Sequence, residues 1–449
     1  MQKVLVQRHA GPAPRYTSYP TAPHFHDGVD SATYGRWLRA LKPGQTLSLY
    51  VHIPYCDRLC WFCGCTTKQT LRYEPLTTYL AALRHEIDTV AELVDPGCRV
   101  TALHWGGGSP TMLKPEDMIA LSDLLRNRFD FDPDAEISVE MDPNDLDGPR
   151  YDALAEIGLT RASIGVQDFD EKVQKAINRL QSFEQTKEVI DQVRARGVKS
   201  VNCDVLYGLP YQTRESVHRT LEQVLSFSPD RIALFGYAHV PWMKTHQKMI
   251  PEDALPDVTE RFAQMNHAAA QVTTAGYAAI GIDHFALPTD SLAIAAATGT
   301  MRRNFQGYTV DTADALIGLG ASSIGQMPQG YVQNVPATAE YQRRVTEGRL
   351  ATERGFELAR EDRVRARAIE LLMCDFAFSF AGMTSEFGPD ANAIIEEATS
   401  LAESEADGLV ELRNGVFRLT EKGRPFVRSI ASAFDTYLQT GKARHSLAV

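Results

Sequence analysis

Apolar runs alternate with amphipathic segments over the middle of the chain. Runs with the composition of buried strands stand at 47–54, 101–105, 136–143, 161–169, 200–210 and 231–241. Each is followed by a segment whose apolar residues recur at helical spacing. This alternation is typical of a mostly parallel sheet with helical crossovers. Six units fall short of a closed eight-unit barrel, so the sequence predicts an α/β fold with a partial (β/α)6 TIM-like barrel.

The polar residues of these runs gather near their carboxyl ends. Ligands bind at that end of the strands both in barrels and in open α/β sheets. We therefore expect the functional site at this edge of the predicted sheet.

The two ends of the chain have a different texture. An N-terminal arm, 1–43, is predicted to be extended or turned rather than helical, apart from one short helix near 31–41, because proline fixes φ and removes a donor. It contains Pro12, Pro14, Pro20 and Pro23. The barrel domain is predicted at 44–355. A C-terminal, mainly helical domain is predicted at 356–449, with a short hairpin turning at Asn414-Gly415.

Composition narrows the class of protein. The 449 residues are 44% hydrophobic and 23% charged, as in ordinary globular proteins. A net charge of −11 argues against a nucleic-acid partner, and so against a DNA-binding role for a winged C-terminal domain. No apolar run approaches the ~18 residues of a membrane helix, and the N-terminus lacks a secretory apolar core. We expect a cytoplasmic protein with no membrane partner.

Four of the seven cysteines lie within ten residues, directly after the first predicted strand. Cys56, Cys60, Cys63 and Cys65 have the spacing C-x3-C-x2-C-x-C. Thiolates this close on one loop can hold one soft metal centre, either an iron–sulfur cluster or zinc. Zinc sites more often use two separated pairs, and no second pair follows. A closed structural metal site remains an alternative, whereas a disulfide suits an intracellular protein less well.

The spacing also indicates which cysteines act together. Only Gly64 separates Cys63 from Cys65, so four thiolates on this loop would be strained if they capped four irons of one cube. Three thiolates can do so and leave one iron open to a small ligand.

Three further features carry chemistry. In HWGGGSPT (104–111), glycines between a strand and a helix either let a ligand approach the backbone or form a tight turn closed by Pro110. Glu140 and Asp204 stand in otherwise apolar strands and need a partner, which is a ligand or an internal ion pair. Tyr50 and His52 share one strand face, where Tyr50 either reaches a pocket or packs in the core.

The cysteine pattern after a first strand resembles that of the radical S-adenosylmethionine (SAM) enzymes. In that family a full or partial barrel carries three cysteines that hold a [4Fe–4S] cluster. The fourth iron binds SAM, whose reductive cleavage gives a 5′-deoxyadenosyl radical. The resemblance implies that Cys56, Cys60 and Cys63 are the cluster ligands and that Phe62 packs on the adenine.

Further motifs resemble one subfamily, the oxygen-independent coproporphyrinogen III oxidases. They are RYTSYPTAPHF in the arm, the extra cysteine Cys65, GGGSPT, EMDP, SIGVQDF, NRLQ, DVLYGLPYQT, YAHVP, GIDHFA and RNFQGYT. The resemblance is strong from about residue 15 to 335 and weaker to the C-terminus. A heme-chaperone branch shares the cluster loop but usually lacks the RYTSYPT arm and the extra cysteine.

The resemblance assigns roles residue by residue. Contacts to the cluster-bound SAM are implied for Gly107, Gly108, Ser109, Glu140, Ala238 and Ile324, with Ser109 where the family usually has Thr. A second SAM is implied beside Gln167, Arg179 and Asp204. Tyr50, Phe305 and Gln306 are implied at the reacting pocket. We add Arg15, Arg302 and Arg303 as candidates for pairing with substrate propionates, with ordinary surface charge as the alternative.

The implied reaction is the oxidative decarboxylation of two propionates of coproporphyrinogen III to vinyl groups, which gives protoporphyrinogen IX. No side-chain base can remove the unactivated β-hydrogen as a proton, so no catalytic side chain is expected beyond the cofactors. An external electron donor and acceptor and a monomeric state are expected. The alternatives are a heme-binding or heme-transfer protein, a zinc protein and a radical SAM methyltransferase.

Overall fold

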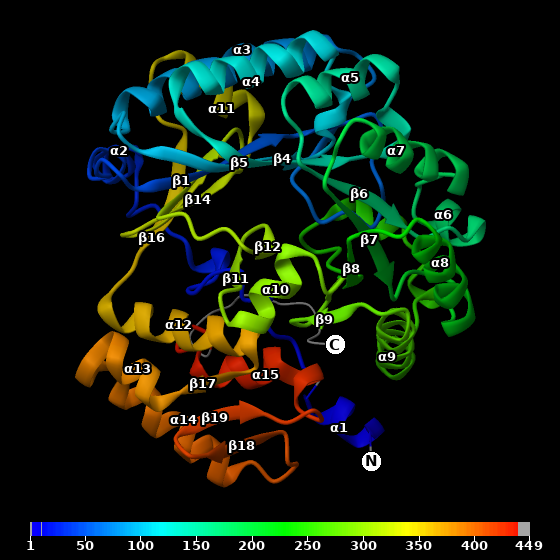
Figure 1. Ribbon diagram of the computed structural model, residues 1–449, viewed down its shortest axis with the longest axis vertical. Helices are drawn as coiled ribbons and strands as arrows, with labels where there is room; N and C mark the ends of the chain where they lie inside the picture. The colour runs from blue at the N-terminus through cyan, green and yellow to red at the C-terminus, as the bar shows by residue number, and fades with distance from the viewer. Residues whose placement is uncertain (1, 10, 439–449) are drawn as a thin grey trace.

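A curved twelve-stranded sheet forms the centre of the computed structural model, which describes residues 2–9 and 11–438. Its strands have the order β16-β15-β14-β13-β1-β4-β5-β6-β7-β8-β10-β9 (Figure 1). The parallel strands are β13 (Ala315–Leu319), β1 (Thr46–Ile53), β4 (Arg99–Gly107), β5 (Asp130–Met141), β6 (Arg161–Gln167), β7 (Ser200–Tyr207) and β8 (Arg231–Gly236). The edge strands β16 (Thr352–Glu357) and β9 (Ala278–Ile280) do not pair with each other, so the barrel is open.

All six predicted strands are confirmed, and the sheet extends beyond them on both sides. The strand β13, which the sequence analysis missed, lies parallel to β1 rather than beside β8. It is followed by the antiparallel strands β14 (Ile324–Met327) and β15 (Gly330–Asn334), while β10 (His284–Ala286) continues the sheet beyond β8. The glycines around β13 hid it, because they weaken the strand pattern.

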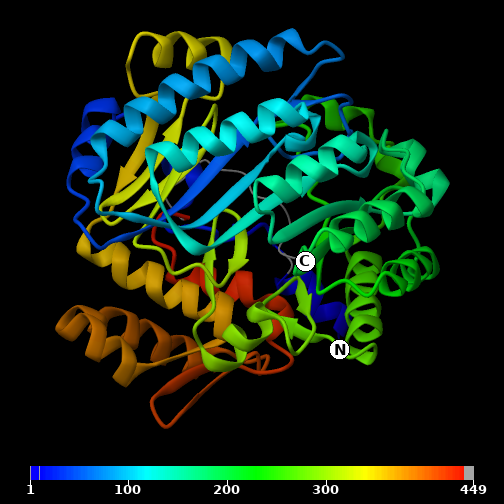
Figure 2. The same ribbon diagram turned by 45° about the horizontal axis from the view of Figure 1, so that its top comes forward.

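Helices cover the outer face of the sheet (Figures 1 and 2). They include α2 (Ser31–Arg39), α3 (Glu74–Leu93), α4 (Pro115–Arg128), α5 (Gly148–Glu156), α6 (Glu171–Ala176), α7 (Phe183–Ala195), α8 (Arg214–Ser226), α9 (Val258–Thr274) and α11 (Thr338–Thr346). Alternate strand residues such as Leu49, Val51 and Trp105 have no exposed surface and belong to the main core. The intervening residues therefore face the barrel interior.

The C-terminal part lies across the open side of the sheet, with α10 (Ser291–Thr298), β11 (Arg302–Asn304) and β12 (Gly307–Thr309) in between (Figure 1). Its helices are α12 (Arg360–Asp375), α13 (Phe380–Phe387), α14 (Asn392–Ser404) and α15 (Val427–Ala431). A small sheet joins β17 (Ala377–Ser379), β19 (Val416–Leu419) and β18 (Val410–Arg413). The predicted hairpin is confirmed, since Asn414 and Gly415 both have positive φ, 52° and 71°.

The C-terminal part has a hydrophobic core of its own, and the N-terminal arm packs into it rather than extending freely. Leu5, Val6, Tyr16 and Tyr19 are buried among side chains of the C-terminal helices. The prediction of an arm without helix before residue 31 was wrong for α1 (Gln2–His9), which precedes the first proline. Tertiary packing of Leu5 and Val6 outweighs the weak helical pattern of this short segment.

Candidate active site

The cysteine loop follows β1 and is closed at its base by two short strands. These are β2 (Tyr55–Cys56) and β3 (Lys68–Gln69), which pair in parallel. The Thr70 N–H donates to the Cys56 carbonyl at 2.9 Å. Within the loop, the Cys63 N–H donates to the Cys60 carbonyl at 3.1 Å. These backbone bonds therefore close the loop that carries the predicted ligands.

Two segments distant in sequence hold this loop from outside. In the NRLQ motif, the Asn178 side chain donates to the Leu59 carbonyl at 3.0 Å, and the Ile177 carbonyl accepts from the Trp61 N–H at 2.9 Å. Asn178 has φ of 54°, a conformation that asparagine adopts more readily than most residues. The NRLQ motif was carried over only for Arg179, so the sequence analysis missed the role of Asn178.

The second segment follows β8. Its side chains donate to carbonyls of the cysteine loop: Lys244 to Cys65 at 2.9 Å and Gln247 to Phe62 at 3.0 Å. The imidazole of His246 lies 2.8 Å from the Cys63 carbonyl. Gln247 also donates to the Ala238 carbonyl at 3.1 Å, which ties the loop to the end of β8. The sequence analysis did not single out any of these three side chains.

No three of the loop's cysteine sulfurs all lie within 4.8 Å of one another. In the described part of the chain, only His9, Glu405 and Asp407 bring three ligand atoms within 4.8 Å of one another. One zinc ion holds its sulfurs about 2.3 Å from the metal, which requires closer sulfurs than this loop offers. A cluster that places each thiolate on a different iron needs wider spacing. The donor set therefore fits an iron–sulfur cluster better than a closed zinc site.

The predicted ligand Cys60 lies beside a buried ion pair. The Arg179 guanidinium donates to Asp142 at 2.9 Å and to the Gly165 carbonyl at 2.7 Å, and it lies 3.7 Å from the Cys60 sulfur. The side chains of Arg179 and Asp142 are 9% and 12% exposed. Gln167, with φ of 65°, lies beside Arg179, because an added Cβ on Gly165 would meet both side chains at about 3 Å.

The interior face of the neighbouring strands carries a row of polar side chains. Tyr50 donates to or accepts from His52 at 2.9 Å and stacks on His104, with ring centroids 5.7 Å apart. His104 lies 3.3 Å from Glu140 and 3.0 Å from the Ser138 hydroxyl. This confirms that Tyr50 and His52 share a face, and it places Glu140 next to them.

Glu140 also accepts from the backbone of the glycine motif. The Gly107 N–H donates to it at 3.0 Å. Burial acts to raise the pKa of Glu140, but the hydrogen bond and charge of His104 and the Gly107 N–H together hold it below its ordinary value. The carboxylate is therefore ionised and able to accept further hydrogen bonds.

At two positions of the glycine motif, the space that a Cβ would fill is taken by other parts of the protein. Gly107 has φ of 112°, and an added Cβ would lie 2.5 Å from the His52 ring. An added Cβ on Gly108 would lie 2.5 Å from the Tyr55 carbonyl. Both glycines thus let the motif close on the cysteine loop. Ser109 is buried and bonds to Asp145 and to the Thr111 hydroxyl.

A cavity of about 130 Å³ inside the barrel brings Glu140 together with Asp204 and Gln306. Asn202 donates to Asp204 at 2.8 Å, and burial raises the pKa of Asp204 to about 6. The amide nitrogen of Gln306 is buried without a hydrogen-bond partner. An unpartnered buried donor beside two carboxyl groups is the arrangement expected of a polar ligand site.

The remaining predicted residues lie in three places. Ile324 on β14 adjoins Gly318, which pairs in register with Tyr50. Phe305 packs against Phe25 of the arm, with ring centroids 6.3 Å apart. Ala238 lines a second cavity, described below.

The three predicted propionate-binding arginines do not converge on one cavity. Arg15 lines the cavity that contains Ala238, whereas Arg303 stacks on the Tyr308 ring at 4.3 Å and donates to the Arg15 carbonyl at 3.1 Å. Arg302 pairs with Glu370 at 3.3 Å.

The open (β/α) barrel and the cysteine loop at the carboxyl edge of its strands define a radical SAM protein. The Radical SAM superfamily model matches residues 50–224, and the HemN C-terminal domain model matches residues 358–426. The chain belongs to the oxygen-independent coproporphyrinogen III oxidase family.

Three comparisons support this membership over nearly the whole chain. The oxygen-independent coproporphyrinogen III oxidase of Paracoccus denitrificans is 48% identical over 97% of this chain and 96% of its own length. That of Bradyrhizobium diazoefficiens is 45% identical over 97% of both. The solved coproporphyrinogen III oxidase from Escherichia coli, described as a radical SAM enzyme, superposes with a TM-score of 0.90 at 39% identity, over 94% of this chain and 97% of its own. These full-length matches do not favour the heme-transfer alternative.

In the described part of the chain, no helix is long and apolar enough to span a bilayer.

Proposed function

We propose that this chain decarboxylates two propionates of coproporphyrinogen III to vinyl groups by radical SAM chemistry and so forms protoporphyrinogen IX in anaerobic heme biosynthesis. The observation that carries the proposal is the cysteine loop, which stands at the mouth of an interior row containing Tyr50, Glu140 and Asp204. The full-length similarity to coproporphyrinogen III oxidases supports the choice of substrate.

We assign Cys56, Cys60 and Cys63 to a [4Fe–4S] cluster, and we assign SAM to the interior face beside it. When bound, the cluster and SAM would supply the 5′-deoxyadenosyl radical that abstracts the β-hydrogen of a propionate. The assignment is supported by the observation that the three sulfurs do not all lie within 4.8 Å of one another, as binding to a single zinc ion would require.

The chain's own residues bind and orient the ligands, and they exclude water. Glu140, ionised and fixed by His104 and Gly107, offers carboxylate oxygens to the SAM ammonium group or ribose. The unpartnered amide of Gln306 can donate to a ligand oxygen in the same cavity. The C-terminal helices and the arm cover the open side of the sheet, which keeps water from a reactive radical.

We retain the second SAM beside Gln167, Arg179 and Asp204 as a finer proposal. Supporting it, Gln167 and Arg179 lie side by side, and Asp204 lies in the cavity that holds Glu140. The external electron donor and acceptor, the monomeric state, the cytoplasmic location and the domain limits 1–43, 44–355 and 356–449 stay predictions of the sequence.

Anaerobic turnover of coproporphyrinogen III with SAM and a reductant tests the proposal. We expect 5′-deoxyadenosine, methionine and vinyl product to form together, and we expect Cys60→Ala to abolish all three. Cys203→Ala is the matched control, because Cys203 is buried in the outer core away from the loop. Wild-type protein that binds heme tightly and forms no vinyl product would overturn the proposal, as would SAM cleavage that persists in Cys60→Ala.

A further inference from the structure

A second cavity, of about 270 Å³, lies where the arm, the barrel and the C-terminal domain meet. We call it the arginine chamber, because Arg15, Arg261, Arg424 and Arg428 line it together with only two acidic residues, Asp283 and Glu421. Its walls come from the ends of β7 and β8, from α9, from the turn before β10 and from the segment leading into α15. Positive charge is therefore concentrated in this cavity, although the chain as a whole has a net charge of −11.

Two of these arginines donate hydrogen bonds only to backbone carbonyls. Arg261 donates to the Tyr237 carbonyl at 2.8 Å, and its Nε is buried without a partner. Arg15, exposed at the mouth, donates to the Gly236 carbonyl at 3.0 Å. No described carboxylate forms an ion pair with either guanidinium.

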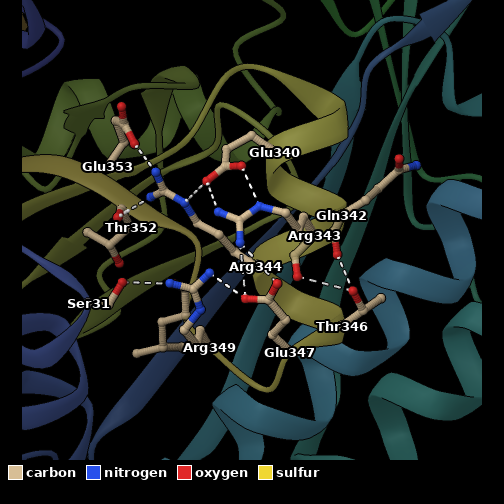
Figure 3. Close-up of polar contacts among 11 residues, drawn as sticks. Ser31, Glu340, Gln342, Arg343, Arg344, Thr346, Glu347, Arg349, Thr352 and Glu353 are labelled. Carbon is tan, nitrogen blue, oxygen red and sulfur yellow. Dashed lines mark hydrogen bonds and ion pairs between the residues drawn. The ribbon is translucent and has the colours of Figure 1, made fainter.

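Surface arginines of this chain behave differently. On α11, Arg343 pairs with Glu340 and Glu347, and Arg344 pairs with Glu340 and Glu353 (Figure 3). Those charges neutralise one another and leave nothing for a ligand. The arginine chamber differs, because no described carboxylate forms an ion pair with Arg261 or Arg15 there.

The acidic residues of the chamber are already engaged. Asp283 bonds to the His284 ring at 2.6 Å, and Glu421 pairs with Arg424 at 3.0 Å. Burial, together with repulsion from Arg15, lowers the pKa of Arg261 and lowers that of Arg428 to about 10. Burying a cation that forms no ion pair is costly, and a carboxylate that enters beside Arg261 would offset that cost while accepting paired N–H donors.

The arginine chamber adjoins the cavity that holds Glu140 and Asp204. His284 lines both cavities, and its ring stands between Phe235 and Tyr308. The two cavities are therefore neighbours with the His284 ring as a shared wall, and a ligand with several carboxylate arms on a flexible ring would have to pass this ring to place one arm in each.

We propose that the arginine chamber binds the substrate carboxylates that are not reacting, with Arg261 and Arg15 as their partners. This site rests on the proposed function, because it takes the substrate to be a tetracarboxylate macrocycle. Its consequence is positional: the arms anchored there determine which propionate faces Glu140 and Asp204.

Binding of the oxidised macrocycle coproporphyrin III tests the proposal without turnover. The anaerobic holoenzyme is titrated with it, with its tetramethyl ester and, separately, with SAM. We expect Arg261→Met and Arg15→Met each to weaken coproporphyrin binding about 10- to 100-fold, the usual range for a lost charged hydrogen bond. Iron content and SAM affinity stay unchanged, and the ester binds wild type and variants equally.

Two further variants guard against a purely structural effect. Arg261→Lys keeps the charge and should recover part of the affinity. Arg194→Met is the control, because Arg194 also donates to backbone carbonyls, those of Phe227 and Ser228, and pairs with Asp230 at 3.6 Å, but does not line the chamber. If Arg261→Met does not fold, the coproporphyrin affinity of Arg15→Met decides the test alone, because the Arg15 side chain is exposed.

The outcomes separate this inference from the proposed function. Variants that bind coproporphyrin within twofold of wild type overturn the arginine chamber, even when wild type makes vinyl product. Loss of SAM affinity in place of porphyrin affinity overturns it as well, because it assigns the arginines to SAM. Wild-type protein that binds coproporphyrin through Arg261 but never decarboxylates coproporphyrinogen leaves the chamber standing and refutes the function.

Discussion

Removal of the Arg179 side chain should destabilise the barrel far more than removal of an exposed arginine nearby. In Arg179→Met, Asp142 loses its cation while it stays 12% exposed, and only the Asn144 N–H groups at 2.9 and 3.0 Å still donate to it. Breaking a buried pair by deleting one partner costs about 3–5 kcal/mol. We therefore expect a loss of that size in the free energy of unfolding.

Arg58 provides the matched control. It pairs with Asp57 at 2.7 Å on the cysteine loop, and the two side chains are 25% and 34% exposed. Exposed pairs contribute about 0.2–1 kcal/mol, so Arg58→Met should have a small effect.

Urea unfolding followed by tryptophan fluorescence measures the difference. All four tryptophans lie between residues 37 and 242, so the signal reports on the barrel. Adding Asp142→Asn to Arg179→Met should recover about 0.5–3 kcal/mol, the coupling expected of contacting residues. Equal losses for Arg179→Met and Arg58→Met, or no recovery in the double variant, would refute the reasoning.

Three other predictions concern the loop, the glycine motif and the interior carboxyl group. Asn178→Ala should lower stability by about 1–2 kcal/mol and lower iron retention, since the hydrogen bond to the Leu59 carbonyl is lost and alanine adopts the positive φ less readily than asparagine does; unchanged iron content after anaerobic desalting would contradict this. Gly107→Ala should lose iron and SAM affinity together, because its Cβ would meet the His52 ring; normal SAM affinity by calorimetry would count against it. The raised pKa of Asp204 means that the folded state holds the proton more tightly than the unfolded state, so ionisation destabilises the fold as pH rises from about 4 to about 6. Across that pH window, the urea midpoint of Asp204→Asn should rise relative to the midpoint of the wild type. If the two midpoints change with pH in parallel, the effect is excluded.

The sequence determined the parts of this protein that depend on short stretches of chain. The cysteine loop could be recognised because its ligands lie within eight residues, Cys56 to Cys63, and the loop closes on itself. The six strands could be found because alternate residues face the helices and the interior. Tyr50, Glu140 and Asp204 were noticed for the same reason, as polar side chains that interrupt apolar strands.

The tertiary structure decided everything that depends on which distant segments meet. The clamps on the cysteine loop come from Asn178 and Gln247, more than 110 residues away in sequence. The strand β13 pairs with β1 across the chain, and the arm packs into the C-terminal core. In the sequence, Arg261 looks like any other arginine of a helix. Only the folded structure shows that no described carboxylate forms an ion pair with it. Local patterns fix local geometry, but ion pairing and burial are properties of the assembled neighbours, and only folding brings those together.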